Sequence, residues 1–257
     1  MKSLIFTLIA FVLGSTFVYA QDAAAIIERS RNRIQSETVS TRFRMTIRGR
    51  GESVSERQMD QYSKKDNSGN NRSVIVFGEP ATVRGTRFLT IENQSGPNEQ
   101  WIFLPSLGRV RRIAAAEGSS SFVGTDFSYD DLASTDRRTN LDNHSIIREE
   151  ILNNRACYVI ESIPIDTAYQ YSRMIQWIDR ENYVPHKVEL YDRRGNLTKL
   201  LEIIDLREVQ GRLTPTVTRM TSLSAGTSTT LNVVNLIYDD PIPESVFTTN
   251  FLETGRP

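Results

Sequence analysis

Alternation of side-chain character is the feature that most constrains the fold of this chain. Between Val39 and Arg48, every second residue is polar, and the residues between them are mostly apolar. The mostly apolar set is Val39, Thr41, Phe43, Met45 and Ile47. A period of two places successive side chains on opposite faces of a strand, so one face is buried and the other is wet. The pattern predicts an antiparallel strand that covers an apolar interior.

Similar short segments, separated by turn-forming Gly, Asn, Asp and Pro residues, continue almost to the end of the chain. We expect further strands at 54–63, 72–77, 87–92, 101–104, 145–152, 157–163, 173–179, 187–191, 197–206, 213–221 and 229–238. The sequence shows no repeat and no linker. The prediction is a mainly β (α+β) domain, in which about eleven strands form one large, curved antiparallel sheet.

One amphipathic helix is expected before the first strand. Asp22 can cap it, and the apolar residues Ala23, Ile26, Ile27 and Ile34 then fall near one face. Such a helix can cover the apolar side of a curved sheet. A few helices fill a concave sheet incompletely, and the expected result is an apolar cavity. The alternative is a solid sheet core.

The first residues have the pattern of an export signal. A lysine precedes the apolar run Leu4 to Val18, and the small residue Ala20 precedes Gln21. We therefore expect residues 1–20 to be a signal peptide cleaved after Ala20, and residues 21–257 to be the mature periplasmic domain. An uncleaved N-terminal anchor is the alternative. Cys157 is the only cysteine, so no internal disulfide can form.

Charge and motifs point away from several function classes. The chain has 31 basic and 31 acidic residues, which gives no general attraction to nucleic acid. There is no G-x-S-x-G, H-E-x-x-H or C-x-x-C motif. Asp126, Asp130 and Asp131 lack the spacing of a calcium loop, and we expect His144 and His186 at the surface. We predict no enzymatic activity, no metal and no cofactor.

The stretch from Trp101 to Leu132 is the longest one without a clear pattern. It has a short apolar run, then Arg109, Arg111 and Arg112, then a Ser-rich turn and alternating aromatic and acidic residues. Long irregular segments in compact domains are often functional, and bulky apolar residues argue against disorder. We predict a partly ordered flap over a pocket.

These residues resemble a known family. The sequence Gly124-Thr125-Asp126-Phe127-Ser128-Tyr129-Asp130-Asp131-Leu132, the arginines before it, the Gly85-Thr86 turn and the closing segment from Ile242 to Phe247 are similar to the outer-membrane lipoprotein-sorting family of the LolA/LolB-like superfamily. The resemblance implies a half-open barrel with a helical lid. It also implies a periplasmic carrier of lipoprotein acyl chains or other lipids toward the outer membrane, working with an inner-membrane RND- or MMPL-type transporter and an outer-membrane acceptor.

Two sets of site residues follow. The candidate lipid-binding wall consists of Phe43, Met45, Ile47, Val74, Val76, Trp101, Phe103, Phe122 and Phe127. Arg109, Arg111 and Arg112 are candidates for contact with a lipid headgroup or a partner, because guanidinium groups fit phosphate oxygens. Their alternative role is local pairing with Asp126, Asp130 and Asp131. An envelope lipid hydrolase and a docking subunit of an exporter are the alternative functions.

Overall fold

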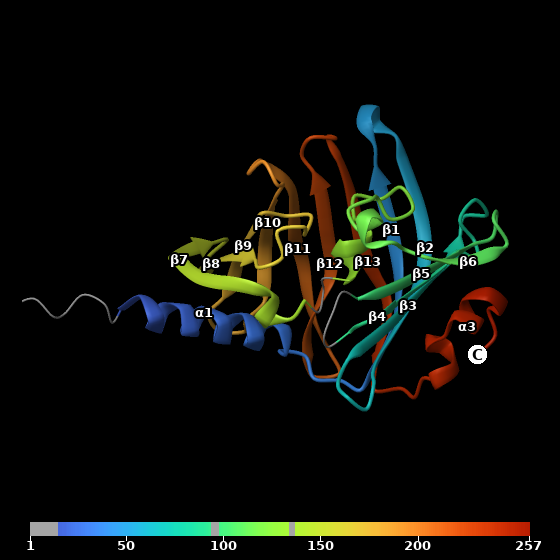
Figure 1. The fold of residues 1–257 in the computed structure, drawn as a ribbon, viewed down its shortest axis with the longest axis horizontal. Helices are drawn as coiled ribbons and strands as arrows, with labels where there is room; N and C mark the ends of the chain where they lie inside the picture. Colours follow the sequence, from blue (N-terminus) through green and yellow to red (C-terminus); the bar gives the residue numbers. More distant parts are fainter. Residues whose placement is uncertain (1–14, 94–97, 134–136) are drawn as a thin grey trace, which may run out of the picture.

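Thirteen strands form a single antiparallel sheet in this chain, whose structure is a computed structural model. The structure describes residues 15–93, 98–133 and 137–257. The sheet is strongly curved and open, and Figure 1 shows its strands wrapping around a concave side. The predicted mainly β architecture is confirmed, with thirteen strands in place of about eleven.

The strands follow one another as two meanders that meet in the middle of the sheet. We call β1 to β6 the first wing and β7 to β13 the second wing. Their spatial order is β6-β5-β4-β3-β2-β1-β13-β12-β11-β10-β9-β8-β7, so β1 pairs with β13, and β6 and β7 are the two edges. The bounds are β1 Thr38–Arg48, β2 Val54–Lys65, β3 Asn71–Glu79, β4 Arg87–Ile91, β5 Glu99–Leu104, β6 Arg109–Arg112, β7 Asp142–Leu152, β8 Arg155–Pro164, β9 Arg173–Asp179, β10 Pro185–Tyr191, β11 Leu197–Val209, β12 Arg212–Ser222 and β13 Thr227–Tyr238.

Short helical elements occupy the connections and the ends. They are α1 Ser15–Arg31, η1 Arg50–Glu52, η2 Ala115–Glu117, α2 Tyr129–Ala133, η4 Thr139–Leu141, η5 Glu244–Phe247 and α3 Thr249–Thr254. The arginine-rich segment that we expected to be part of a loop is the edge strand β6. Its four residues alternate too briefly to be recognised in the sequence.

Helix α1 covers one wing of the sheet. Its described span is Ser15–Arg31, so Asp22 lies within the helix and not at its start, which corrects the expectation. The predicted apolar face is confirmed at Ala23, Ile26 and Ile27, which pack on Ile160 of β8 and Ile178 of β9. Among the residues the structure describes, no helix combines the length and the apolar character needed to cross a membrane.

The C-terminal segment covers the outer face of the first wing, at β3 and β4. Phe247, Phe251 and Leu252 pack against Val74 and Leu89, which point outward from β3 and β4. Figure 1 shows α3 beside the wing that contains β3 to β6. Helix α3 is capped by Thr248, whose hydroxyl accepts a hydrogen bond from the Phe251 amide at 3.1 Å. The outer face is therefore closed by a well-packed cluster.

Removal of this cover tests how much stability it contributes. Leu252 is 0% exposed, and we expect Leu252→Ala to lower the free energy of unfolding by about 2–5 kcal/mol, because it removes buried methyl groups and leaves a cavity. Urea denaturation followed by tryptophan fluorescence measures the change. Leu107→Ala is the control, since Leu107 is 53% exposed and its loss should matter by no more than about 0.5 kcal/mol. Equal effects of the two changes would contradict the packing described here.

Candidate functional site

The connection between the two edge strands crosses the concave face of the sheet. Residues 113–141, which we call the strap, link β6 to β7 at opposite edges. In Figure 1 this green segment passes in front of the central strands. Its described residues contact both wings, since Phe122 and Tyr129 pack among β1 to β5 and Phe127 packs among β9 to β13. The part of the predicted flap from Ile113 onward therefore belongs to the strap, which crosses the sheet from one wing to the other.

Aromatic packing fixes the strap on the first wing. The Phe122 ring lies 5.7 Å from the Phe77 ring and 5.1 Å from the Phe88 ring, and Tyr129 meets Phe122 edge-on at 5.7 Å. These centroid distances fall in the range of favourable aromatic pairs. Met45 and other inward side chains of β1 to β5 complete this cluster, which closes one end of the half-barrel.

A tight turn forms the tip of the strap. The Thr125 amide donates to the Phe122 carbonyl at 3.0 Å, and both residues between them have positive φ, 48° at Val123 and 73° at Gly124. That geometry suits glycine and is unfavourable for a β-branched valine. Arg57 of β2 donates to the Val123 carbonyl at 2.6 Å and so holds the strained residue in place.

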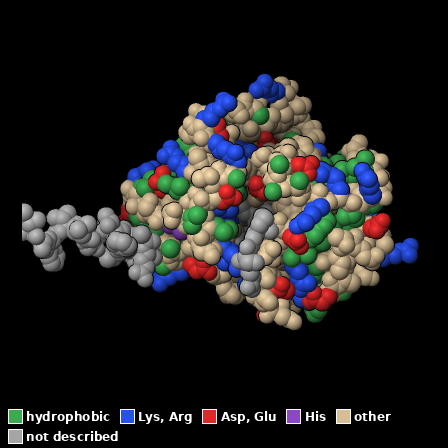
Figure 2. Space-filling view, in the orientation of Figure 1, with side chains coloured by type: hydrophobic (Ala, Val, Ile, Leu, Met, Phe, Trp, Pro, Cys, Tyr) green, Lys and Arg blue, Asp and Glu red, His purple; other side chains and the backbone are tan. Residues whose placement is uncertain are grey.

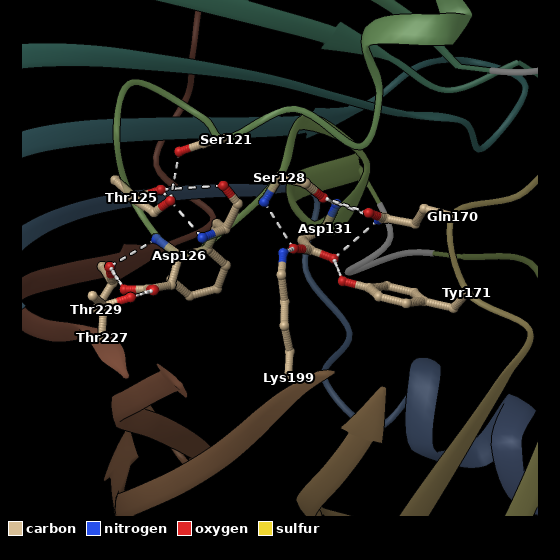
Figure 3. A network of polar contacts seen from close by, with 11 residues as sticks. Ser121, Thr125, Asp126, Ser128, Asp131, Gln170, Tyr171, Lys199, Thr227 and Thr229 are labelled. Atoms are coloured by element: carbon tan, nitrogen blue, oxygen red, sulfur yellow. Dashed lines mark hydrogen bonds and ion pairs between the residues drawn. The ribbon is translucent and has the colours of Figure 1, made fainter. Parts of the chain in front are cut away.

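Two buried aspartates attach the strap to the second wing, as Figure 3 shows. Asp126 accepts hydrogen bonds from Thr227 and, at 2.7 Å, from Thr229, both on β13. Its amide donates to the Thr229 hydroxyl at 3.0 Å. The carboxylate is therefore fully engaged by the sheet, which removes most of the cost of its burial.

Asp131 is the centre of the second network in Figure 3. It forms a capping box with Ser128 at the start of α2, through the Ser128 amide at 2.7 Å and the Asp131 amide at 3.0 Å. It also accepts from Tyr171 at 2.7 Å and pairs with Lys199 of β11 at 2.7 Å. Burial, and then the Asp131 charge, raise the pKa of the Tyr171 phenol. Tyr171 and Lys199 thus tie the strap to the loop before β9 and to β11.

A cavity of about 680 Å³ lies between the strap, the end of α1 and the concave face. Its apolar part is lined by residues from both wings: Phe43, Met59, Ile75, Phe88, Phe127, Met174, Val188, Leu190, Leu201, Met220, Leu231 and Val233. The volume is in the range of about 300–1,000 Å³ that small-molecule sites occupy. Room for an apolar ligand therefore remains inside the half-barrel.

Strand register makes the lining change from apolar to polar along the cavity. Phe43 is paired with Met59, the next inward row contains Gln61, Ile75 and Phe88, and the row after that is formed by Val39, Ser63, Ser73 and Thr90. The far end, which we call the mouth, is lined by charged residues that include Arg33, Glu92, Arg137, Arg138 and Asp142. An amphiphile fits such a gradient better than a purely apolar ligand does.

The predicted lipid-binding residues fall into three groups. Phe43 and Phe127 line the cavity, whereas Met45, Ile47 and Phe122 belong to the adjoining apolar cluster. The expected wall needs correction at the other four, because Val74, Val76, Trp101 and Phe103 lie on the outer face beneath the C-terminal segment. The alternation explains this result, since Ile75 and Ile102 between them point inward.

The three arginines of β6 lie away from the cavity lining. Arg109 is exposed on the edge strand, Arg111 pairs with Glu117 at 2.9 Å, and Arg112 pairs with Glu99 at 2.7 Å. Arg111 and Arg112 therefore pair with glutamates and not with the aspartates that the sequence offered as the alternative. Asp126 is bonded to β13 instead, and Asp131 to β11 and the loop before β9.

Both histidines are more buried than the sequence indicated, which corrects the expected surface positions. His144 lines the mouth, where its Nδ1 lies 2.8 Å from the Ser162 hydroxyl and its Nε2 lies 2.9 Å from the Thr139 carbonyl. His186 lies 3.4 Å from Asp179. The sequence also did not predict that residues of the second wing, such as Met174 and Leu231, line the cavity. Alternation marked those strands, but only the register shows which face is inside.

Comparisons with known proteins agree with this geometry. A family model described as that of an uncharacterized protein matches residues 69–254. The structure of a DUF1329 family protein from Desulfovibrio piger has 27% sequence identity and a TM-score of 0.87, and the match covers 91% of this chain and 99% of the other. The chain belongs to the family of uncharacterized proteins that this model describes.

Two further structures extend the comparison. A Vibrio parahaemolyticus protein described as an outer membrane lipoprotein-sorting protein domain has 28% identity and a TM-score of 0.86, and the match covers 91% of this chain and 99% of the other. A LolA superfamily protein from Nitrosomonas europaea has 21% identity and a TM-score of 0.71, with 89% and 98% covered. The resemblance found in the sequence is confirmed, and the fold is LolA-like. A search of curated proteins finds no match.

Asp130, the neighbour of Asp131, leads to a prediction on how stability depends on pH. Burial, and then the charge of Asp131, raise the pKa of the Asp130 carboxyl, while Arg137 opposes the shift. A raised pKa means that the folded state disfavours the ionised form, so Asp130 lowers stability as pH rises above its unfolded pKa, and the full loss is present above its folded pKa. We expect Asp130→Asn to be more stable than the parent at pH 7, with a difference that disappears below about pH 3.9, the usual unfolded value.

Thermal denaturation from pH 3 to pH 8 measures this difference. Asp240→Asn is the control, because Asp240 is exposed and its replacement should leave the pH profile unchanged. An Asp130→Asn protein that is less stable than the parent at pH 7, with a deficit that disappears toward low pH, would show that the sign of the shift is opposite.

Proposed function

We propose that this protein is a periplasmic carrier that holds a lipid, or an acyl chain of a lipoprotein, in the cavity under the strap. The observation that supports the proposal most strongly is a cavity of about 680 Å³, lined by apolar side chains and covered by a segment that belongs to the same chain. Each methylene buried there contributes about 0.8 kcal/mol, so an acyl chain can bind firmly without any reaction.

The attachment of the strap supports a carrier cycle. Its described contacts with β9 to β13 combine the Phe127 packing with hydrogen bonds and one ion pair, at Asp126 and Asp131. Such polar contacts can exchange with water when the strap moves, whereas its aromatic contacts with the first wing can persist. In the proposed cycle the strap opens on the second wing, the acyl chain enters, and transfer runs downhill to a better-binding acceptor. No nucleotide is consumed by this protein.

The partners that fit this cycle lie in the two membranes. We propose an inner-membrane RND- or MMPL-type transporter as the donor and an outer-membrane protein as the acceptor. The relatives support the general role, since one of them is described as an outer membrane lipoprotein-sorting protein domain. A protein that only docks to an exporter would co-purify with it and hold no lipid in its cavity.

One observation favours a lipid hydrolase as the second candidate. The Ser162 hydroxyl lies 2.8 Å from His144, and the Thr139 carbonyl beside Nε2 favours the tautomer in which Nδ1 can accept the serine proton. Ser162 is 0% exposed, however, and is not part of the cavity lining, so the carrier is the better-supported function. Release of fatty acid from phospholipid that is lost in Ser162→Ala would establish the hydrolase.

Filling the cavity tests the carrier. Val233 lines the cavity, whereas the next residue, Val234, is 55% exposed. We expect Val233→Trp to weaken binding of the neutral fluorescent probe N-phenyl-1-naphthylamine at least tenfold, because the indole occupies the space of the ligand. Val234→Trp is the matched control and should bind as the parent does. Native mass spectrometry should show lipid on the parent and less on Val233→Trp; a parent protein that binds neither lipid nor probe would overturn the proposal.

Export gives a separate prediction. We propose that residues 1–20 are removed, which leaves Ala23, Ile26 and Ile27 in place on the sheet. N-terminal sequencing of protein recovered from the periplasm of an expressing bacterium should therefore begin at Gln21. A mature protein that starts at Met1 and stays with the membrane fraction would instead support the uncleaved anchor.

A further inference from the structure

The mouth of the cavity carries more positive than negative charge. Among the described residues that line the cavity, six are basic and four are acidic. The face shown in Figure 2, by contrast, has basic and acidic side chains mixed over it, in line with the equal totals of the chain. The excess at the mouth is therefore a local property of the site.

Most of the charged groups at the mouth already have partners. Glu92 pairs with Arg138 at 2.8 Å and with Arg31 at 3.3 Å, and it accepts from the Asn71 amide at 2.8 Å. Arg137 binds Asp142 through two nitrogens, with the shortest contact at 2.6 Å. One carboxylate of Glu92 thus serves two guanidinium groups, and this leaves the cluster positive.

Among the described charged residues of the lining that are at least partly buried, Arg33 is the exception. It follows α1, is partly buried and lines the cavity, and within the described ranges its guanidinium makes a single hydrogen bond, to the Leu213 carbonyl at 2.8 Å. No carboxylate pairs with it in the part of the chain that the structure describes. Burial lowers the pKa of the Arg33 guanidinium, in keeping with a charge withdrawn from water. A guanidinium has five N–H donors, so Arg33 can bind an anion at low cost.

The two ends of the cavity together define an amphiphile. The apolar end under Phe127 takes a hydrocarbon chain, and the mouth beside Arg33 takes what is attached to that chain. An acyl group joined to a protein through an ester or an amide brings no negative charge to this position. A free fatty acid or an acidic phospholipid does.

We propose that the preferred cargo is a free lipid with an anionic head, whose carboxylate or phosphate is bound by Arg33 at the mouth while its chain lies under the strap. This inference rests on the proposed carrier function and narrows it to one class of ligand. Arg33 is assigned as the residue that selects for the charged head.

Displacement of N-phenyl-1-naphthylamine from the mature protein by oleate and by methyl oleate at pH 8 tests the assignment. The two ligands share a chain and differ in charge. We expect oleate to bind about tenfold more tightly relative to methyl oleate, the factor that one charge-assisted hydrogen bond typically provides. This ratio should fall to about one in Arg33→Met and persist in Arg33→Lys. Arg44→Met is the matched control, because it removes one positive charge from an exposed position of β1 and should keep the ratio.

Each outcome bears on a different claim. Equal binding of the two ligands, unaffected by Arg33→Met, would overturn the anionic-head assignment and leave the carrier intact. Failure of both ligands to displace the probe, or of the probe to bind, would remove the carrier itself. Inorganic phosphate alone should not raise the melting temperature; a rise that requires Arg33 would show a site for free anions and overturn the lipid assignment.

Discussion

The position of β6 and β7 at opposite edges is the constraint on which the site depends. The chain has to travel from one edge to the other, and a short connection around the outside is not available to a sheet of this width. The strap therefore passes over the concave face and covers it. This connectivity, together with the packing of Phe122 and Phe127 on the concave face, encloses the space inside the half-barrel.

Anchoring by aspartates rather than by apolar packing alone has consequences for that space. Asp126 and Asp131 are buried, and each is satisfied by side chains of the sheet or of the loop before β9, so they fix the height of the strap above the concave face. A buried carboxylate that loses one partner is costly, which makes the closed arrangement specific. An apolar strap would be free to collapse into the cavity and fill it; a hydrogen-bonded one keeps its distance.

Much of this could be predicted from the sequence, because alternation identifies strands and the faces within each strand. Twelve of the thirteen strands follow from such local patterns. The inner face could not be derived in the same way. Val74 and Ile75 are equally apolar neighbours, and only the register with β2 and β4, and the direction in which the sheet curves, place Ile75 inside. Trp101 and Phe103 were assigned to the wrong side for the same reason.

The two faces of the β3–β4 wing differ in how they are filled, and this difference explains why a cavity remains on only one of them. The outer face is covered by the large side chains of Phe247, Phe251 and Leu252, which pack closely. The inner face carries Ser73 and Thr90 toward the mouth, where small polar side chains leave room and cannot form a core. A protein that needed only stability would place larger apolar residues there. Small inward residues beside a positive mouth are instead what the polar end of an amphiphile requires.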